Sequence, residues 1–266
     1  MKKIFSLALL VAFLATSAKA DDIISTLEKQ CDTGDFTACD NLGCEYSRGE
    51  YVEPDYKKAK KLFEMACEAN NAEGCGHLGF LYGQGKEIKQ DYPKAISLYD
   101  KACSLGFFES CTNLGISYML GTGVEVDLKK SIELFNKSCD ADHSPACTLL
   151  GNAYFNGDGV EKDATKANEF YLKACDLSNP EACANLGLNY AQGEGADQDF
   201  EKAYEFFTKG CDLGAGEGCF NTGVMYVNGW GVEQDFNIGK EYYQKACHFG
   251  YKQGCDEYTN MTNEGL

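Results

Sequence analysis

Cysteine pairs recur along this chain at a fixed interval. Fourteen of its fifteen cysteines form seven C-x7-C pairs, and the first members of successive pairs stand 36 residues apart. The pairs are Cys31 and Cys39, Cys67 and Cys75, Cys103 and Cys111, Cys139 and Cys147, Cys175 and Cys183, Cys211 and Cys219, and Cys247 and Cys255. A period of this size without insertions indicates a solenoid, in which one small structural unit is stacked many times.

Each unit resolves into two helices. Cys111, Leu114 and Tyr118 recur at helical spacing, and glycines then end the segment, which predicts a first helix that we call helix A. The following residues, 128–139, place Phe135 on an apolar face and predict a second helix, helix B, with Asp127 as its N-cap. The chain is therefore expected to be all-helical.

The cysteine spacing also predicts a pairing. In one straight helix the two cysteines of "CDLGAGEGC", residues 211–219, would lie about 12 Å apart along the axis, whereas a disulfide needs Cα atoms within about 7 Å. The residues between them are turn formers, so we expect the chain to reverse there. Each local pair would then form a disulfide between helix B of one unit and helix A of the next. Neither CxxC nor a histidine at ligand spacing is present, and we expect no metal site and no cofactor.

The first twenty residues read as a secretory signal. Lys2 and Lys3 precede an apolar run that ends in the small-residue site Ala18-Lys19-Ala20. We expect cleavage near Ala20, and a protein that is secreted or periplasmic. That compartment is oxidising, which agrees with the predicted disulfides.

The rest of the chain, residues 21–266, is predicted to be a single domain. Residues 22–31 resemble a lone helix B and would cap the N-terminal end. Six repeats follow, over residues 32–67, 68–103, 104–139, 140–175, 176–211 and 212–247. Residues 248–266 begin like a helix A but are more polar, and would form the C-terminal cap.

The charge of the chain restricts its partners. Without the first twenty residues, 21 lysines and arginines face 41 acidic residues. This balance disfavours nucleic acid and anionic membranes, and no later segment is apolar enough to insert into a bilayer. A basic peptide or protein surface is a better match. Alternatively, the acidic residues form a solvated outer face that keeps the protein soluble.

The repeated residues carry a resemblance to a known family. The unit A-C-x-N-L-G-x-x-Y-x-x-G-x-G-V-x-x-D-x-x-K-A-x-x-x-F-x-K-A-C resembles the Sel1-like repeat, a relative of the tetratricopeptide repeat. Together with the C-x7-C spacing and the signal, it is similar to the Helicobacter cysteine-rich proteins in particular. The resemblance implies a right-handed αα-superhelix of six disulfide-stapled helical hairpins, with a concave surface used for binding. It also implies a slow penicillin-binding or β-lactamase activity, or contact with host proteins, because members are described in both ways.

The sequence itself offers little catalytic machinery. After the signal there is no S-x-x-K, S-D-N or K-T-G motif, and the nearest approach is "TLEK", residues 26–29. His77, His143 and His248 occupy different positions of the repeat, and we expect each to be a surface or hydrogen-bonded histidine. Slow hydrolysis of a β-lactam amide therefore remains the alternative to a binding function.

A binding function has more support in the sequence. The position two residues after the second cysteine of each pair, which we call the amide slot, lies off the core stripe of helix A. Its occupants are Asn41, His77, Asn113, Leu149, Asn185 and Asn221. Asn189 and Asn228 are predicted to share this face. Amides both donate and accept hydrogen bonds, so this face suits an extended peptide, a protein segment or a peptidoglycan-related strand, bound by a monomer. Alternatively, these are ordinary polar residues of an exposed helix face.

Two single residues stand out. Cys44 has no partner in the C-x7-C pattern, and its repeat position is mostly apolar elsewhere. It is either a small buried side chain or the site of an intermolecular disulfide. Trp230, the single tryptophan, either is exposed at the mouth of the groove or packs against the C-terminal cap.

Overall fold

The computed structural model describes residues 22–265, and this part of the chain is helical without any strand. The predicted signal lies outside the described residues. A first helix covers residues 22–32. The A helices are α2 (Phe36–Arg48), α4 (Ala72–Gln84), α6 (Phe108–Leu120), α8 (Ser144–Asn156), α10 (Pro180–Gln192) and α12 (Gly216–Asn228). The B helices are α3 (Tyr56–Glu68), α5 (Tyr92–Ser104), α7 (Leu128–Asp140), α9 (Ala164–Asp176), α11 (Phe200–Asp212) and α13 (Phe236–His248), and α14 (Lys252–Glu264) follows them.

The helix ends are set by residues that repeat with the same period. Asp127 caps α7, where its Oδ1 accepts a hydrogen bond from the backbone N–H of Lys130 at 2.9 Å. The aspartates one or more periods away cap the other B helices in the same way. The A helices end at glycines with positive φ, as at Gly157 with φ of 88°. The predicted N-caps are therefore confirmed.

A glycine inside each A helix allows close packing of its B helix. A Cβ added to Gly43 would lie 2.6 Å from Cε1 of Phe63, and one added to Gly151 would lie 2.4 Å from Cε1 of Tyr171. Any larger side chain would collide with these buried rings. The helix propensity lost at each glycine is therefore offset by the packing of an aromatic ring against the bare backbone.

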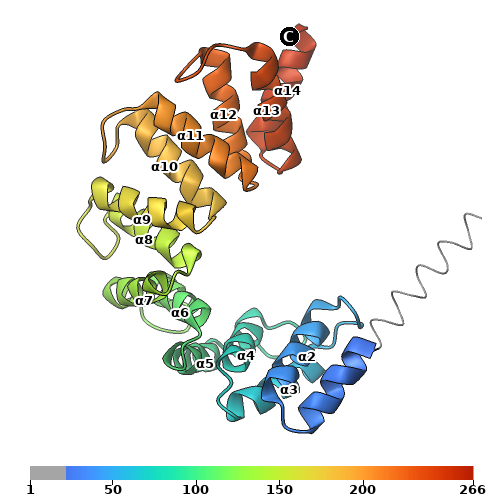
Figure 1. Ribbon diagram of the computed structural model, residues 1–266. Helices are drawn as coiled ribbons and strands as arrows, with labels where there is room; N and C mark the ends of the chain where they lie inside the picture. Colours follow the sequence, from blue (N-terminus) through green and yellow to red (C-terminus); the bar gives the residue numbers. More distant parts are fainter. Residues whose placement is uncertain (1–21, 266) are drawn as a thin grey trace, which may run out of the picture. The chain divides into compact units, whose positions relative to one another are not determined.

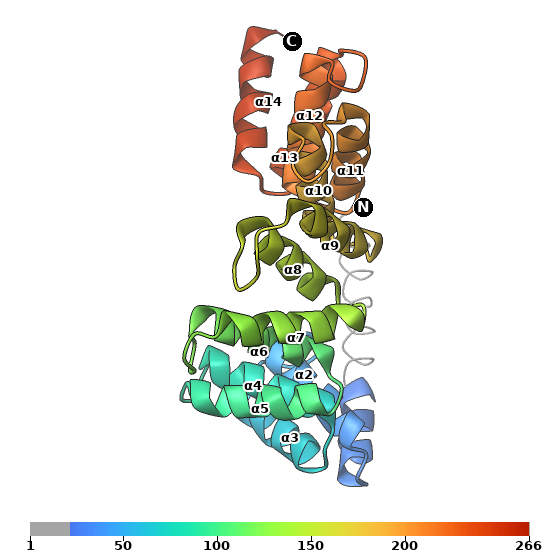
Figure 2. The same ribbon diagram turned by 90° about the vertical axis from the view of Figure 1, so that its left-hand side faces the viewer.

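The chain divides into two compact units, one ending at Val126 and one beginning at Asp127. In the first unit, α2 to α5 form two antiparallel hairpins and α6 packs against α5 (Figure 1). In the second unit, each A helix from α8 to α12 pairs with the B helix that follows it, and α14 packs against α13 (Figure 2). Each unit is a stack of helical hairpins. The extent of a single domain over residues 21–266 stays a prediction.

Seven disulfides join successive helices, three in the first unit and four in the second. Every C-x7-C pair is bridged, with Cα–Cα distances of 4.4 to 4.8 Å. Each bridge connects a B helix, or the helix over residues 22–32, to the next helix in the chain. The turn between Cys211 and Cys219 reverses at Gly214, whose φ is 98°. The predicted all-helical, disulfide-stapled solenoid is thus confirmed. Disulfides in this number fit an extracellular or periplasmic protein.

No helix within residues 22–265 combines the length and the apolar character that a membrane span requires.

Candidate functional site

The amide slot is accessible at each predicted asparagine. Asn41 on α2 is exposed, and Asn113, Asn185 and Asn221 on α6, α10 and α12 are half-buried. Within residues 22–265, none of these four side chains has an intramolecular hydrogen-bond partner. Their amides are therefore free to bond an external group.

The two other predicted amides differ from them. Asn228 is exposed, but its Nδ2 donates a hydrogen bond to the carbonyl oxygen of Val224 at 2.8 Å. Asn189 is only 3% exposed, and its Nδ2 donates to Oδ1 of Asn168 at 2.7 Å. Asn168 in turn donates to the carbonyl oxygen of Glu194 at 2.9 Å. The prediction that Asn189 lies on the accessible face is wrong, because the side chain is used inside the hairpin of α10 and α9.

A cavity of about 330 Å³ opens in the first unit beside the amide slot. Two consecutive occupants of the slot, His77 and Asn113, line it together. Its remaining walls are largely aromatic and come from Phe63, Phe80 and Phe107. A concave site with apolar walls and a few polar groups is the usual form of a ligand pocket.

Charged groups stand around the same cavity. Arg48, the only arginine of the chain, lines it together with Lys86 and Glu109. Two cationic side chains and one carboxylate therefore leave a net positive charge among these three groups. It suits a ligand that carries an anionic group next to an apolar one.

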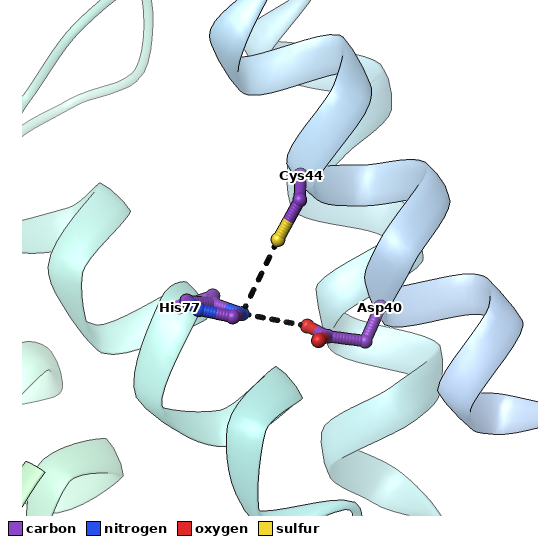
Figure 3. Close-up of side chains that lie close together, drawn as sticks. All are labelled: Asp40, Cys44 and His77. Atoms are coloured by element: carbon purple, nitrogen blue, oxygen red, sulfur yellow. Dashed lines mark hydrogen bonds and ion pairs between the residues drawn. The ribbon is translucent and has the colours of Figure 1, made fainter. Parts of the chain in front are cut away.

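At one side of the cavity, three polar side chains converge (Figure 3). Asp40 and Cys44 lie one turn apart on α2 and point toward His77 on α4. Nδ1 of His77 lies 2.8 Å from Oδ1 of Asp40 and 3.5 Å from Sγ of Cys44. Asp40 is 2% exposed and Cys44 is 9% exposed. The cluster is therefore largely shielded from solvent by the packing of α2 against α4.

The cluster changes the ionisation of the histidine. Burial lowers the pKa of His77, but the hydrogen bonds to Asp40 and Cys44 outweigh this effect and raise the pKa from 6.5 to about 10. His77 is consequently an imidazolium at neutral pH, and its Nδ1–H donates to the buried carboxylate of Asp40. The expectation of a hydrogen-bonded histidine is met at this position.

The arrangement is not a nucleophilic relay. Such a relay needs the thiol and the carboxylate on opposite ring nitrogens, so that the imidazole can pass a proton between them. Here Cys44 and Asp40 both contact Nδ1 of His77. The cluster therefore gives no specific support to a hydrolase.

Sequence reasoning missed this cluster, although a signal was present. The position of Asp40 holds Gly, Thr, Thr, Ala and Phe in the other five repeats, and that of Cys44 holds Phe, Ile, Asn, Leu and Val. His77 replaces the asparagine found in four of the six amide slots. Each departure from the repeat was visible alone. Their convergence required the packing of one A helix on the next.

The remaining singled-out residues have ordinary surroundings. Trp230 is 46% exposed and stacks on the ring of Phe200, with the centroids 5.5 Å apart. The exposure of Trp230 favours a place at the mouth of the groove over packing against the C-terminal cap. His143 occupies the N-cap position of α8, and the ring of His248 lies 5.7 Å from that of Phe249.

Comparison with known families identifies the repeat. The model of the Sel1 repeat family matches residues 37–71, 72–107, 108–143, 144–179, 180–214 and 216–248. This chain belongs to the Sel1 repeat family. The matched segments begin at the A helices, a few residues after the repeat starts predicted from the cysteines. A Sel1-repeat chain is a scaffold of the kind that mediates protein interactions, and the predicted family is confirmed.

Solved structures show the same fold. The chain is similar to c5321, described as a protective antigen present in uropathogenic Escherichia coli strains displaying an SLR fold, with a TM-score of 0.81 and 28% identity over 91% of this chain and 52% of that one. It therefore spans about half the length of that antigen. A Sel1 repeat protein from Oxalobacter formigenes gives a TM-score of 0.74 and 23% identity, over 86% of this chain and 89% of that one.

Cysteine rich protein B from Helicobacter pylori is also similar, at 29% identity and a TM-score of 0.41, over 49% of this chain and 94% of that one. Comparison with curated protein sequences finds no match to the chain.

Proposed function

We propose that this protein is an exported Sel1-repeat scaffold that binds an extended peptide segment of a protein partner along its A helices. The observation that carries the proposal is the cavity of the first unit, where His77 and Asn113 meet an aromatic wall. The unpartnered amides of the slot would bond the backbone of the peptide. The cavity would take one of its side chains.

The size and lining of the cavity define that side chain. A volume of about 330 Å³ lies at the lower limit of small-ligand pockets, so it suits one bulky residue rather than a whole cofactor. Phe63, Phe80 and Phe107 favour an apolar or aromatic group. Arg48 and Lys86 would hold a carboxylate next to it, such as an acidic neighbour or a C-terminal carboxylate.

The full sequence is strongly acidic, with a formal net charge of −17. The field around it would therefore speed association with a partner that is basic overall. An apolar anchor with a carboxylate beside it, within an otherwise basic segment, is the ligand that combines both features. A peptidoglycan-related strand offers the carboxylates and amides but lacks the aromatic anchor.

The test is a selection of random peptides on the immobilised, oxidised protein, followed by titration of the selected sequences and of peptidoglycan fragments. We expect peptides with an aromatic or large apolar residue to bind. Asn113→Ala should weaken their binding, because it removes a slot amide from the cavity. Asn237→Ala is the matched control, since Asn237 is an exposed asparagine on the B helix α13.

Equal loss of affinity in both variants, or no loss in Asn113→Ala, would contradict the proposal. Binding of peptidoglycan fragments without any peptide binding would replace the peptide by a glycan-peptide ligand. In either case the Sel1-repeat fold itself stays as described.

A further inference from the structure

Three side chains at the edge of the cavity combine the donor atoms that transition metals prefer. We infer that Asp40, Cys44 and His77 form a binding site for one divalent transition-metal ion of the zinc class. One ligand atom from each residue lies within 4.8 Å of those of the other two. Within residues 22–265, this is the only group of at least three such side chains that meets this condition.

The distances suit a tetrahedral centre. Zinc bonds of about 2.3 Å to sulfur and about 2.0–2.1 Å to nitrogen place these two ligand atoms about 3.5 Å apart. Sγ of Cys44 and Nδ1 of His77 are 3.5 Å apart in the structure. Nδ1 and Oδ1 of Asp40 are 2.8 Å apart, which is a hydrogen-bond distance. An ion replacing the shared proton would widen this separation by about 0.5 Å, a small rotation of the carboxylate.

The fold holds the three donors before any ion binds. Asp40 and Cys44 stand four residues apart on α2, so they project from one face of the helix. His77 on α4 is held between two aromatic rings, with centroid distances of 5.4 Å to Phe63 and 5.8 Å to Phe107. The disulfides Cys31–Cys39 and Cys67–Cys75 fix the starts of the two helices. Little ordering would therefore accompany binding.

The donor set selects the ion. A thiolate, an imidazole and a carboxylate favour Zn²⁺, Co²⁺ or Ni²⁺ over Ca²⁺ and Mg²⁺, which prefer oxygen ligands alone. Three protein ligands leave a fourth position open, as in zinc sites that exchange water or substrate. Cys44 and His77 both line the cavity, so that position faces it and is accessible to a water molecule or an anionic group.

The repeat pattern gives an independent reason to infer a metal site. A repeat scaffold needs none of these residues for its fold, because the other five repeats have different side chains at all three positions. Moreover, a metal would protect the one unpaired thiol in a chain whose other cysteines are all oxidised. The inference does not depend on the peptide ligand proposed above.

The experiment uses the full oxidised protein, treated with a chelator and then titrated with Co²⁺. We expect one Co²⁺ per chain and a sulfur-to-cobalt charge-transfer absorption in the near ultraviolet, which Zn²⁺ then abolishes by displacement. In Cys44→Ser the charge-transfer band should disappear. In His77→Asn the Kd should rise at least tenfold, since removing even an outer partner of a metal ligand costs about 10–100-fold.

The variants are chosen to keep the fold. Asn is the residue of the amide slot in four repeats, so His77→Asn restores the repeat pattern. His248→Gln removes a histidine elsewhere and should bind Co²⁺ like the parent protein. Circular dichroism and a count of intact disulfides would verify that each variant is folded.

Absence of Co²⁺ binding by the folded parent protein, or binding that Cys44→Ser and His77→Asn leave unchanged, would overturn the inference. Binding lost equally in His248→Gln would do the same, because it would show that the ions occupy nonspecific surface sites.

Discussion

Asp40 on α2 accepts a hydrogen bond from His77 on α4 at 2.8 Å, and this contact links two consecutive A helices through an ion pair of a buried aspartate and a half-buried histidine. In the other five repeats, the positions that correspond to Asp40 and to His77 hold uncharged residues. The first of the five boundaries between the six repeats is thus built differently from the others. It is also the boundary at which the first unit opens into a cavity.

The ion pair makes the stability of the first unit depend on pH. The pKa of His77 is raised from 6.5 to about 10, so its contribution is fully present below about pH 6.5 and is lost as the pH rises toward 10. We expect the Tm, measured with a chelator present, to fall over this window, by about 2–4 °C for each kcal/mol lost. The other charged or titratable groups that line the cavity are Cys44, Arg48, Tyr56, Lys86 and Glu109. These groups remain in the His77→Asn variant, so its Tm should fall much less over the same pH range.

The packing of glycine against aromatic rings predicts that two glycine-to-alanine substitutions have opposite effects on stability. In Gly151→Ala the new Cβ would lie 2.4 Å from the ring of Tyr171, so we expect a loss of about 1–3 kcal/mol. In Gly83→Ala the nearest atom, the hydroxyl of Tyr99, is 3.6 Å away, so the variant should gain up to about 1 kcal/mol of helix propensity. Urea denaturation of both proteins checks the contrast. Similar losses in the two would show that close approach is not the reason for the glycine.

Burial divides the asparagines of the A helices into those that stabilise the fold and those whose amides are available to a ligand. Asn189→Ala should cost about 1–3 kcal/mol of stability, because it leaves Oδ1 of the buried Asn168 without its hydrogen-bond donor. Asn185→Ala, one turn away on α10, should leave the stability unchanged, since its amide has no partner within the described chain. Thermal denaturation distinguishes them. A stable Asn189→Ala protein would contradict the hydrogen-bond assignment.

The odd cysteine should behave as a shielded thiol. Cys44 is 9% exposed and is the single free cysteine, so one thiol per chain should react slowly with iodoacetamide in the folded protein and rapidly in denaturant. Non-reducing electrophoresis should show a monomer. Fast labelling of the folded protein, or a dimer that Cys44→Ser abolishes, would instead support the intermolecular disulfide.

The fold could be predicted almost completely because every determinant recurs. Cysteines, capping aspartates and packing glycines each appear at one spacing, so several weak signals at one repeat position act as one strong signal. The cysteine spacing led to the right pairing because turn residues such as Gly214 permit the reversal that the disulfide requires.

The candidate site could be predicted only in part, and for the opposite reason. Asp40, Cys44 and His77 depart from the repeat pattern. Such departures do not show which of these side chains will contact one another in the folded protein. Asn189 was misplaced because its neighbour Asn168 lies on the B helix, at a position where periodicity gives no hint of a buried polar partner. Side-chain contacts between helices decide such cases.

The most direct test of the proposed function is amide chemical-shift mapping of the isotope-labelled, oxidised protein during titration with a selected peptide. We predict that the largest shifts occur at the A helices of the first unit, around His77, Phe107 and Asn113. Shifts confined to the B helices, or to loops remote from the amide slot, would contradict the account.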